Sequence, residues 1–242
     1  MNTWPAEQSV LMEGWVLRTS SGYTKRANSV NPLYGAQASI DEIAGRIERA
    51  ERYYLDAGLK PVFKITPYVQ PIELDEFLAD RGYGIVEPSS VRVRNLDNLA
   101  VADHRYSITV GDELSEEWLD VFAELGGLSL EQQNTLRRML QSSNLLQGFA
   151  ILRNEGVPAS CGLGVIQHGY IGLYDIITAP SQRRQGMAEQ MLLGLLGWGK
   201  NRGATDSFLQ VVQANRGASA LYDKLGFKEI YQYWYRVKNK YV

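Results

Sequence analysis

The chain has 242 residues, 45% of them hydrophobic and 21% charged, a composition typical of globular proteins with room for two cores of ordinary size. Its 25 Lys and Arg residues nearly balance 27 Asp and Glu residues, and the net charge of −2 argues against nucleic acid or an anionic membrane as partner. A single cysteine excludes an intrachain disulfide, and no signal peptide or run of about 20 apolar residues is visible, so we expect a cytoplasmic protein.

The first part of the chain is predicted to alternate strands and helices. Alternating side chains predict a strand over 14–20, and apolar residues three and four apart predict a helix over 39–57. Ser39 is placed to cap this helix, with Glu42 three residues later. A strand over 62–66, a helix over 71–80 and a strand over 85–94 are expected to follow.

Residues 95–105 are polar and unpatterned, and we place a domain boundary there. The two predicted domains cover residues 1–98 and 104–242. In the second domain we expect strands over 106–110, 148–154, 159–167, 170–178, 206–212 and 229–237, and helices over 116–125, 131–142, 186–202 and 218–225.

The segment 176–188 is the most informative part of the chain. A β-branched run ends at Pro180, a turn with Arg183 and Arg184 follows, and a helix begins near Gly186. A strand that passes through a tight turn into a helix directs free backbone N–H groups toward one point, where the helix dipole favours a phosphate. Gly186 permits close approach of an anion, and the arginines add positive charge. An ordinary helix start beside a solvated basic turn is the alternative.

Residues 183–188, Arg-Arg-Gln-Gly-Met-Ala, resemble the Arg/Gln-x-x-Gly-x-Gly/Ala signature of the GNAT superfamily of N-acetyltransferases. The preceding strand 174–178 and the later Asn215 and Ala-Ser-Ala-Leu-Tyr-Asp-Lys-Leu-Gly-Phe at 218–227 are similar to that family in order and spacing. The resemblance implies that acetyl-coenzyme A is the co-substrate and that its pyrophosphate lies at the turn. The coenzyme-binding residues that it implies are Ile176, Ile177, Thr178, Arg183, Arg184, Gln185, Gly186, Met187, Ala188 and Asn215.

Acetyl transfer to an amine needs a neutral nitrogen and a way to discharge the coenzyme A thiolate. Tyr222 matches the family tyrosine whose hydroxyl faces the sulfur, so the resemblance implies that Tyr222 is the acid; a packed tyrosine is the alternative. Asn215 would contact the pantetheine arm or cap the next helix. The base is not identified by any pattern: Asp175 and Glu124 are candidates, and water is a third possibility.

Other nucleophilic or metal-binding arrangements gain no support from the sequence. Cys161 could carry an acetyl group, but its small neighbours on a predicted strand favour a core residue. The two histidines, His104 and His168, both fall in predicted turns, so we expect neither a Ser-His-Asp triad nor a metal site.

Segments 77–83 and 221–227 resemble each other. In each, a short predicted helix is ended by a glycine, and an aromatic residue then leads into a predicted strand. This indicates a duplicated domain. Aligning Gly82 with Gly226 places Leu78 opposite Tyr222, and no phosphate-turn signature precedes the helix 39–57. We therefore expect a degenerate first copy and one coenzyme site per chain.

Residues 23–32 carry many hydrogen-bonding side chains and few apolar ones. We interpret them as a substrate-facing loop in the cleft between the halves, with Arg26 and Asn28 contacting the amine; a solvated loop is the alternative.

The sequence thus predicts an α+β protein with two GNAT-like domains, each a mixed, mostly antiparallel sheet flanked by helices. The expected function is transfer of an acetyl group from acetyl-coenzyme A to a primary amine in a ternary complex. The alternative is a non-catalytic acyl-coenzyme A sensor or interaction module. The pattern identifies neither the amine nor the oligomeric state.

Overall fold

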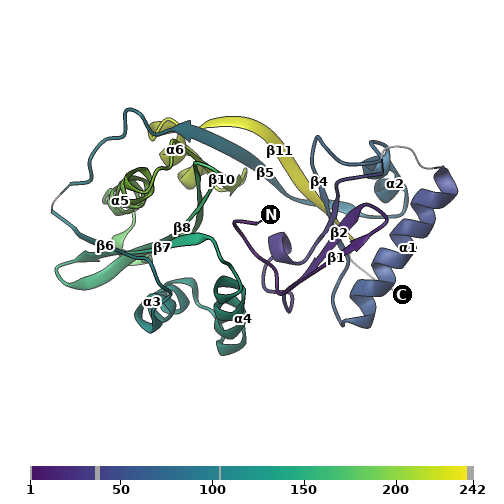
Figure 1. Ribbon diagram of the computed structural model, residues 1–242, viewed down its shortest axis with the longest axis horizontal. Coiled ribbons are helices and arrows are strands. Elements are labelled where there is room, and N and C mark those ends of the chain that lie inside the picture. Colours follow the sequence, from purple (N-terminus) through teal and green to yellow (C-terminus); the bar gives the residue numbers. More distant parts are fainter. Residues whose placement is uncertain (1, 36–38, 104, 239–242) are drawn as a thin grey trace.

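The computed structural model describes residues 2–35, 39–103 and 105–238. All of its strands join one mixed sheet of 11 strands, with helices on both faces (Figure 1). The strands are β1 (Gln8–Met12), β2 (Trp15–Thr19), β3 (Val30–Pro32), β4 (Val62–Ile65), β5 (Gly84–Asn95), β6 (Ser107–Gly111), β7 (Leu146–Asn154), β8 (Val157–Gln167), β9 (Tyr170–Thr178), β10 (Asp206–Val212) and β11 (Lys228–Val237). The α-helices are α1 (Ile40–Asp56), α2 (Leu74–Asp80), α3 (Glu116–Gly126), α4 (Leu130–Gln141), α5 (Met187–Asn201) and α6 (Arg216–Lys224).

Every helix and strand predicted from the sequence is present, with ends displaced by at most three residues. The capping box of α1 is confirmed, because Ser39 and Glu42 each accept a hydrogen bond from the other's backbone. Ile40, at the start of this helix, is 67% exposed, whereas Ala50 lies in the core. The sequence also missed β1 and β3. The first is an exposed edge strand without alternation, and the second is only three residues long and ends in proline.

The two halves of the chain exchange their last strands at the centre of the sheet. β5 lies between β10 and β11, and β11 lies between β4 and β5 (Figure 1). Both central strands pair antiparallel with each other and with the half to which they do not belong in sequence. The α+β class and the mostly antiparallel sheet are confirmed, but the halves share one sheet. The division into residues 1–98 and 104–242 stays a prediction.

The turns that lead into the exchanged strands have the same geometry. Before β5, Gly82 has φ +79° and the Tyr83 N–H donates to the Leu78 carbonyl at 3.0 Å. The equivalent turn before β11 has Gly226 at φ +82° and a bond of 2.9 Å from Phe227 to the Tyr222 carbonyl. A left-handed glycine after the last helical turn is a common C-cap. The match supports the alignment of Leu78 with Tyr222.

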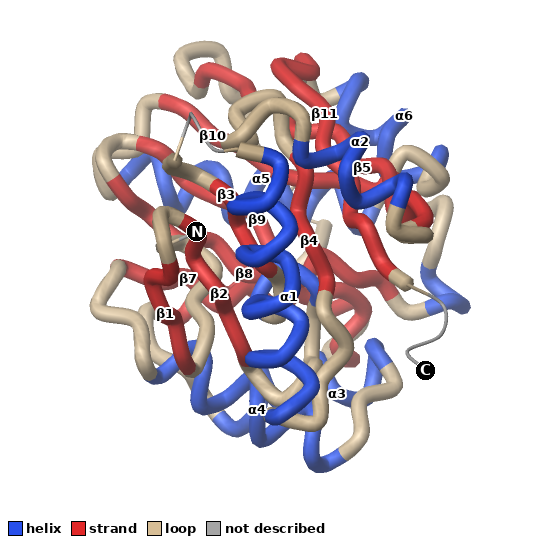
Figure 2. Tube along the Cα trace, turned by 90° about the vertical axis from the view of Figure 1, so that its right-hand side faces the viewer, coloured by secondary structure: helices blue, strands red, loops and turns tan. Residues whose placement is uncertain are grey.

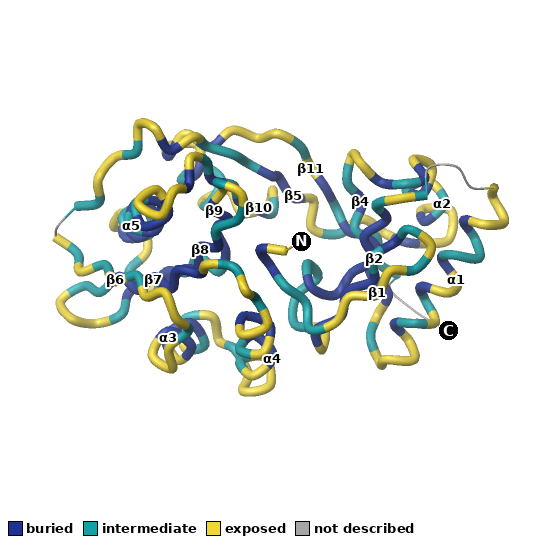
Figure 3. The backbone as a smooth tube through the Cα atoms, in the orientation of Figure 1, coloured by how far each residue is buried: buried dark blue, intermediate teal, exposed yellow. Residues whose placement is uncertain are grey.

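The sheet has two unlike faces, which we call outer and inner. Helices α1, α2, α5 and α6 cover the outer face, and Figure 2 shows α1 running along β2 and β4. Along β11, Trp234 packs toward the core beneath α1, whereas Tyr233 and Tyr235 point to the inner face. The inner face is covered by α3, α4 and the amino-terminal segment, which is buried where it passes between the two halves (Figure 3). Trp4 in this segment is 2% exposed and stacks on Tyr174.

Among the helices in the described ranges, none has both the length and the apolar character to cross a bilayer.

Candidate functional site

The sheet opens where β9 and β10 part. These parallel strands pair only between residues 170–173 and 206–209. Further along, β9 continues beside β8, while β10 continues beside β5. Within the described residues, the facing edges of the two strands therefore have no strand partner beyond this point, and their backbone groups are available to a bound ligand.

A β-bulge marks the point of separation. Asp175 and Ile176 together lie opposite the single residue Gly162, and Asp175 has φ +51°. Because of the bulge, Tyr174 and Asp175 both face the inner side, whereas Ile176 joins the core on the outer side. A Cβ at Gly162 would lie 2.8 Å from Cδ1 of Ile176, so a glycine is needed beneath the bulge. Bulges are common beside functional sites because they redirect side chains.

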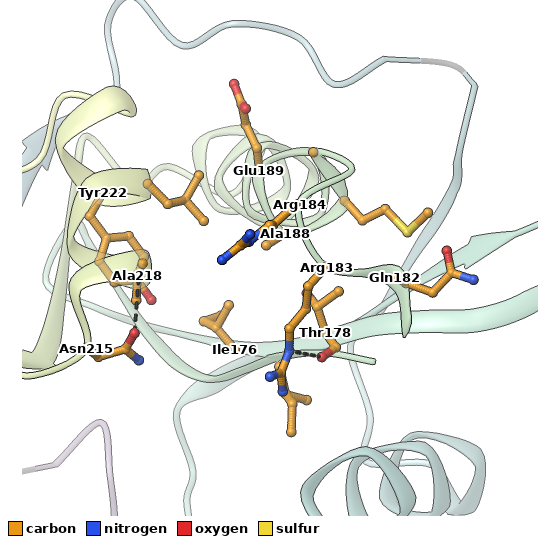
Figure 4. A pocket seen from close by; sticks show the side chains of 15 residues that line it. Ile176, Thr178, Gln182, Arg183, Arg184, Ala188, Glu189, Asn215, Ala218 and Tyr222 are labelled. Carbon is orange, nitrogen blue, oxygen red and sulfur yellow. Dashed lines mark hydrogen bonds between the residues drawn. The ribbon is translucent and has the colours of Figure 1, made fainter. Parts of the chain in front are cut away.

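A cavity of about 580 Å³ lies on the outer face at this opening. It is bounded by the end of β9, the turn 182–186, the start of α5 and one face of α6 (Figure 4). All of the coenzyme-binding residues implied by the sequence line it except Gln185, whose amide turns back to the Ser181 carbonyl at 3.3 Å. The sequence missed the lining residues Gln182, Glu189, Gly217, Ala218 and Leu221. Ala218 lies four residues before Tyr222 and three before Leu221, so helical spacing could have indicated two of these.

The turn before α5 has the features of an anion site. Gly186 is the N-cap residue with φ +82°, and no side chain among the described residues caps the helix. The N–H groups of residues 187–189 therefore lack intrahelical partners and face the cavity rim. Arg184 has φ +61°, and its guanidinium points into the cavity (Figure 4). Arg183 donates to the Thr178 carbonyl at 3.2 Å, which ties the turn to β9.

Tyr222 and Asn215 border the cavity from α6. Tyr222 is 7% exposed, and burial raises the pKa of its phenol to about 12 although Arg26 and Arg92 oppose the shift. The phenol is therefore protonated at neutral pH. Asn215 accepts a hydrogen bond from the Ala218 N–H at 3.1 Å, so the capping role predicted as one alternative is confirmed.

The two candidate bases lie in different places. Asp175 faces the inner side, and its Oδ2 is buried without a hydrogen-bond partner among the described residues. Burial raises the pKa of its carboxyl to about 7, and the positive charge of Arg26 opposes that shift. Glu124 is exposed on α3 and does not line the cavity on the outer face. Asp175 is thus the carboxyl group held at the opening of the sheet.

The remaining candidates behave as core or turn residues. Cys161 is fully buried, and burial together with Asp175 raises the pKa of its thiol, which confirms its prediction as a core residue. His168 lies in the turn between β8 and β9 with φ +49°. The other histidine, His104, lies outside the described residues.

The segment 23–32 is not a solvated loop. Asn28 is 6% exposed and accepts hydrogen bonds from the Ser20 and Gly22 N–H groups at 2.6 and 2.9 Å. Its prediction as a substrate contact is wrong, because its amide is used to hold the loop together. The side chain of Arg26, unlike that of Asn28, lies against aromatic rings: its guanidinium is 5.1 Å from the ring centre of Trp4 and 5.6 Å from that of Tyr174.

The sheet that opens at a bulge, the uncapped helix start with arginines and the buried tyrosine beside the same cavity agree with the N-acetyltransferase site that the motif at 183–188 implies. A family model described as "Probable histone acetyltransferase Rv0428c C-terminal" matches residues 1–236, and the chain belongs to this family.

The relatives agree with this assignment. The chain is 31% identical over 239 residues to the "Uncharacterized N-acetyltransferase YobR" of Bacillus subtilis (strain 168), covering 98% of this chain and 94% of the relative. It is 26% identical over 226 residues to the "Probable histone acetyltransferase Rv0428c" of Mycobacterium tuberculosis, covering 93% of this chain and 67% of the relative. The protein is accordingly an acyltransferase enzyme.

Solved structures share the fold. A GCN5-related N-acetyltransferase from Kribbella flavida superposes with a TM-score of 0.71 at 15% identity, covering 98% of this chain and 91% of its own. A tandem GNAT protein from the clavulanic acid biosynthesis pathway gives a TM-score of 0.64 at 13% identity, covering 82% and 70%.

Proposed function

We propose that the protein transfers an acetyl group from acetyl-coenzyme A to a primary amine. The observation that carries this proposal is the cavity on the outer face, where the uncapped start of α5, the free edge of β9 and Tyr222 meet. A pyrophosphate would receive hydrogen bonds from the backbone of residues 186–189 and charge from Arg183 and Arg184. Lys224 is ion-paired to Glu189 at 2.5 Å, which offsets the charge of a carboxylate that lines the cavity.

The pantetheine arm would lie along the free edge of β9, with Ile176, Ile177 and Thr178 beside it and Asn215 across the cavity. This placement brings the thioester to the point where β9 and β10 part. It also brings the sulfur toward Tyr222.

The chemistry then needs two proton transfers. The amine nitrogen attacks the thioester carbonyl, the new C–N bond forms, and the C–S bond breaks. The Asp175 carboxylate takes the proton lost by the amine, and the Tyr222 hydroxyl donates to the departing sulfur. A carboxyl with a pKa of about 7 is partly ionised at neutral pH and still basic enough to accept that proton.

We further propose that residues 1–98 are a degenerate copy without a coenzyme site and that residues 104–242 hold the only one. In the first half, Leu78 takes the place of Tyr222 and supplies no hydroxyl. At the start of α1, the side chain of Glu42 accepts from the Ser39 N–H at 2.6 Å and would repel a phosphate. The start of α5 has no such carboxylate cap.

The test is release of free coenzyme A thiol from acetyl-coenzyme A in the presence of an amine panel. An enzyme of this kind shows release that depends on the amine and yields the acetylated product. Binding of acetyl-coenzyme A without release by any amine would favour the sensor instead.

A further inference from the structure

A second cavity, of about 330 Å³, lies on the inner face of the sheet. It is enclosed by the segment 22–26 on one side and by β5, β10 and β11 on the other. Its wall includes Tyr23, Arg26, Gln210, Tyr233 and Tyr235. None of its lining residues is shared with the cavity on the outer face. We call it the inner cavity.

The inner cavity adjoins the opening of the sheet. Tyr23 and Arg26 line it, and both interact electrostatically with Asp175. The next residue in sequence, Ile176, lines the outer cavity. Gln210 belongs to β10 just beyond its last pairing with β9. A ligand in the inner cavity would therefore meet a thioester held on the outer side at this opening.

Positively charged side chains gather around the inner cavity, and Asp175 is the carboxyl group with which Arg26 interacts. The Arg26 guanidinium is stacked on aromatic rings and makes no ion pair among the described residues. Lys64 on β4 places its Nζ 4.0 Å from the ring centre of Tyr233, again without an ion pair in those ranges. Burial, together with the positive charges of Arg26 and Arg18, lowers the pKa of Lys64 to about 7. At the rim, Lys25 and Glu87 pair at 2.5 Å and cancel each other.

Polar groups of the wall are also left for a ligand. The Tyr235 hydroxyl is buried and has no hydrogen-bond partner among the described residues. The Tyr233 hydroxyl donates to Gln210 Oε1 at 2.8 Å, which fixes the amide and leaves its NH₂ group as a donor. Buried charges and hydroxyls without partners destabilise a fold, and such groups are commonly found where a bound ligand supplies the missing hydrogen bond or counter-charge.

Building on the proposed function, we propose that the inner cavity binds the acceptor and that this acceptor is a small amine that also carries a carboxylate. Arg26 holds the carboxylate, Lys64 adds positive charge behind Tyr233 when it is protonated, and the amine lies toward Asp175. The volume suits a small molecule. The positive charge of Arg26 disfavours a polyamine, which would need a more acidic site.

Binding is the primary test, because it does not depend on turnover. Glutamate, phenylalanine and lysine, each with its decarboxylated amine, are titrated by calorimetry into the protein saturated with coenzyme A. We expect at least one amino acid to bind more tightly than its decarboxylated amine by about 10-fold or more, the effect of one charged hydrogen bond. Equal binding of both members of every pair, tighter binding of the amines, or no binding at all would overturn the proposal.

Two variants then assign the carboxylate contact. Lys64→Met should weaken binding of the preferred amino acid about 10-fold and Arg26→Met by up to about 100-fold, with the decarboxylated amine unaffected. Lys60→Met, at an exposed lysine of the loop before β4, is the matched control and should change nothing. An equal loss for both members of a pair would contradict the assignment. Amino acid binding without thiol release would contradict the proposed function and the acceptor role, and would support the inner cavity only as an amino acid site.

Discussion

Asp175 and Ile176 are consecutive in the chain but face opposite sides of the sheet. The bulge opposite Gly162 turns Asp175 toward the inner cavity and Ile176 toward the outer one. The two cavities are therefore separated by a single stretch of backbone at the point where β9 and β10 part. An acyl donor and an acceptor bound on opposite sides would meet there, and the carboxyl group of Asp175 lies on the acceptor's side.

Tyr222→Phe tests the acid. The phenyl ring keeps the packing against Phe227, so affinity for acetyl-coenzyme A should stay the same. Loss of the proton donor should lower kcat by about 10²- to 10³-fold, a usual effect for one acid or base. Steady-state kinetics and calorimetry measure the two quantities. Tyr170→Phe, at a tyrosine that is 45% exposed, is the control and should be active. Full kcat in Tyr222→Phe would remove Tyr222 from the chemistry.

Asp175→Asn should change how stability depends on pH. The pKa of Asp175 is raised from 3.8 to about 7, so the folded state binds this proton more tightly than the unfolded state. Stability contributed by that proton is complete below the unfolded pKa and is lost as pH rises through about 7. The asparagine variant has no carboxyl group to titrate, so its free energy of unfolding should not fall in this way as pH rises.

The free energy of unfolding, measured with urea at about pH 5 and pH 7, provides the comparison. Relative to wild type, the variant should gain about 2 kcal/mol between these two pH values, because each pKa unit corresponds to about 1.4 kcal/mol. Its acyl transfer should fall by about 10²-fold or more. If variant and wild type differed in free energy of unfolding by the same amount at pH 5 and at pH 7, the carboxyl group of Asp175 would not be buried as described.

The exchanged strands predict that the halves stay together after cleavage of the connection between them. A protease site inserted beside Val101, which is 82% exposed, should be cut in the native protein. Because β5 lies between β10 and β11, the two pieces should still elute together from a size-exclusion column and unfold in one transition. Separate elution without denaturant would mean that the halves are independent domains.

Local features of this protein were predictable from sequence. The turn at 183–188, the capping box of Ser39 and the helix that presents Tyr222 depend on neighbours within a few residues, and spacing reveals them. Gln185 was placed in the site because it belongs to the motif, although its side chain points away from the cavity.

Long-range features were not predictable. β5 and β11 carry similar strand patterns, and nothing in either indicates that it pairs with the other half of the chain. Beside the inner cavity, Arg26 interacts electrostatically with Lys64 and with Asp175, and the three residues come from distant segments, so no spacing could bring them together. Asn28 looked like a substrate contact because a polar residue that organises a buried loop has the same composition signal as one that faces a ligand.

Binding of acetyl-coenzyme A to wild type, Gly186→Glu and Gly203→Glu tests whether the turn before α5 holds the coenzyme. Both glycines have positive φ, +82° and +87°, and a Cβ on either meets no atom within 4 Å, so the two substitutions strain the backbone alike. Only Gly186 lines the outer cavity. By calorimetry, we expect one site per chain in wild type and in Gly203→Glu and no binding in Gly186→Glu. Two sites in wild type, or undiminished binding in Gly186→Glu, would contradict it.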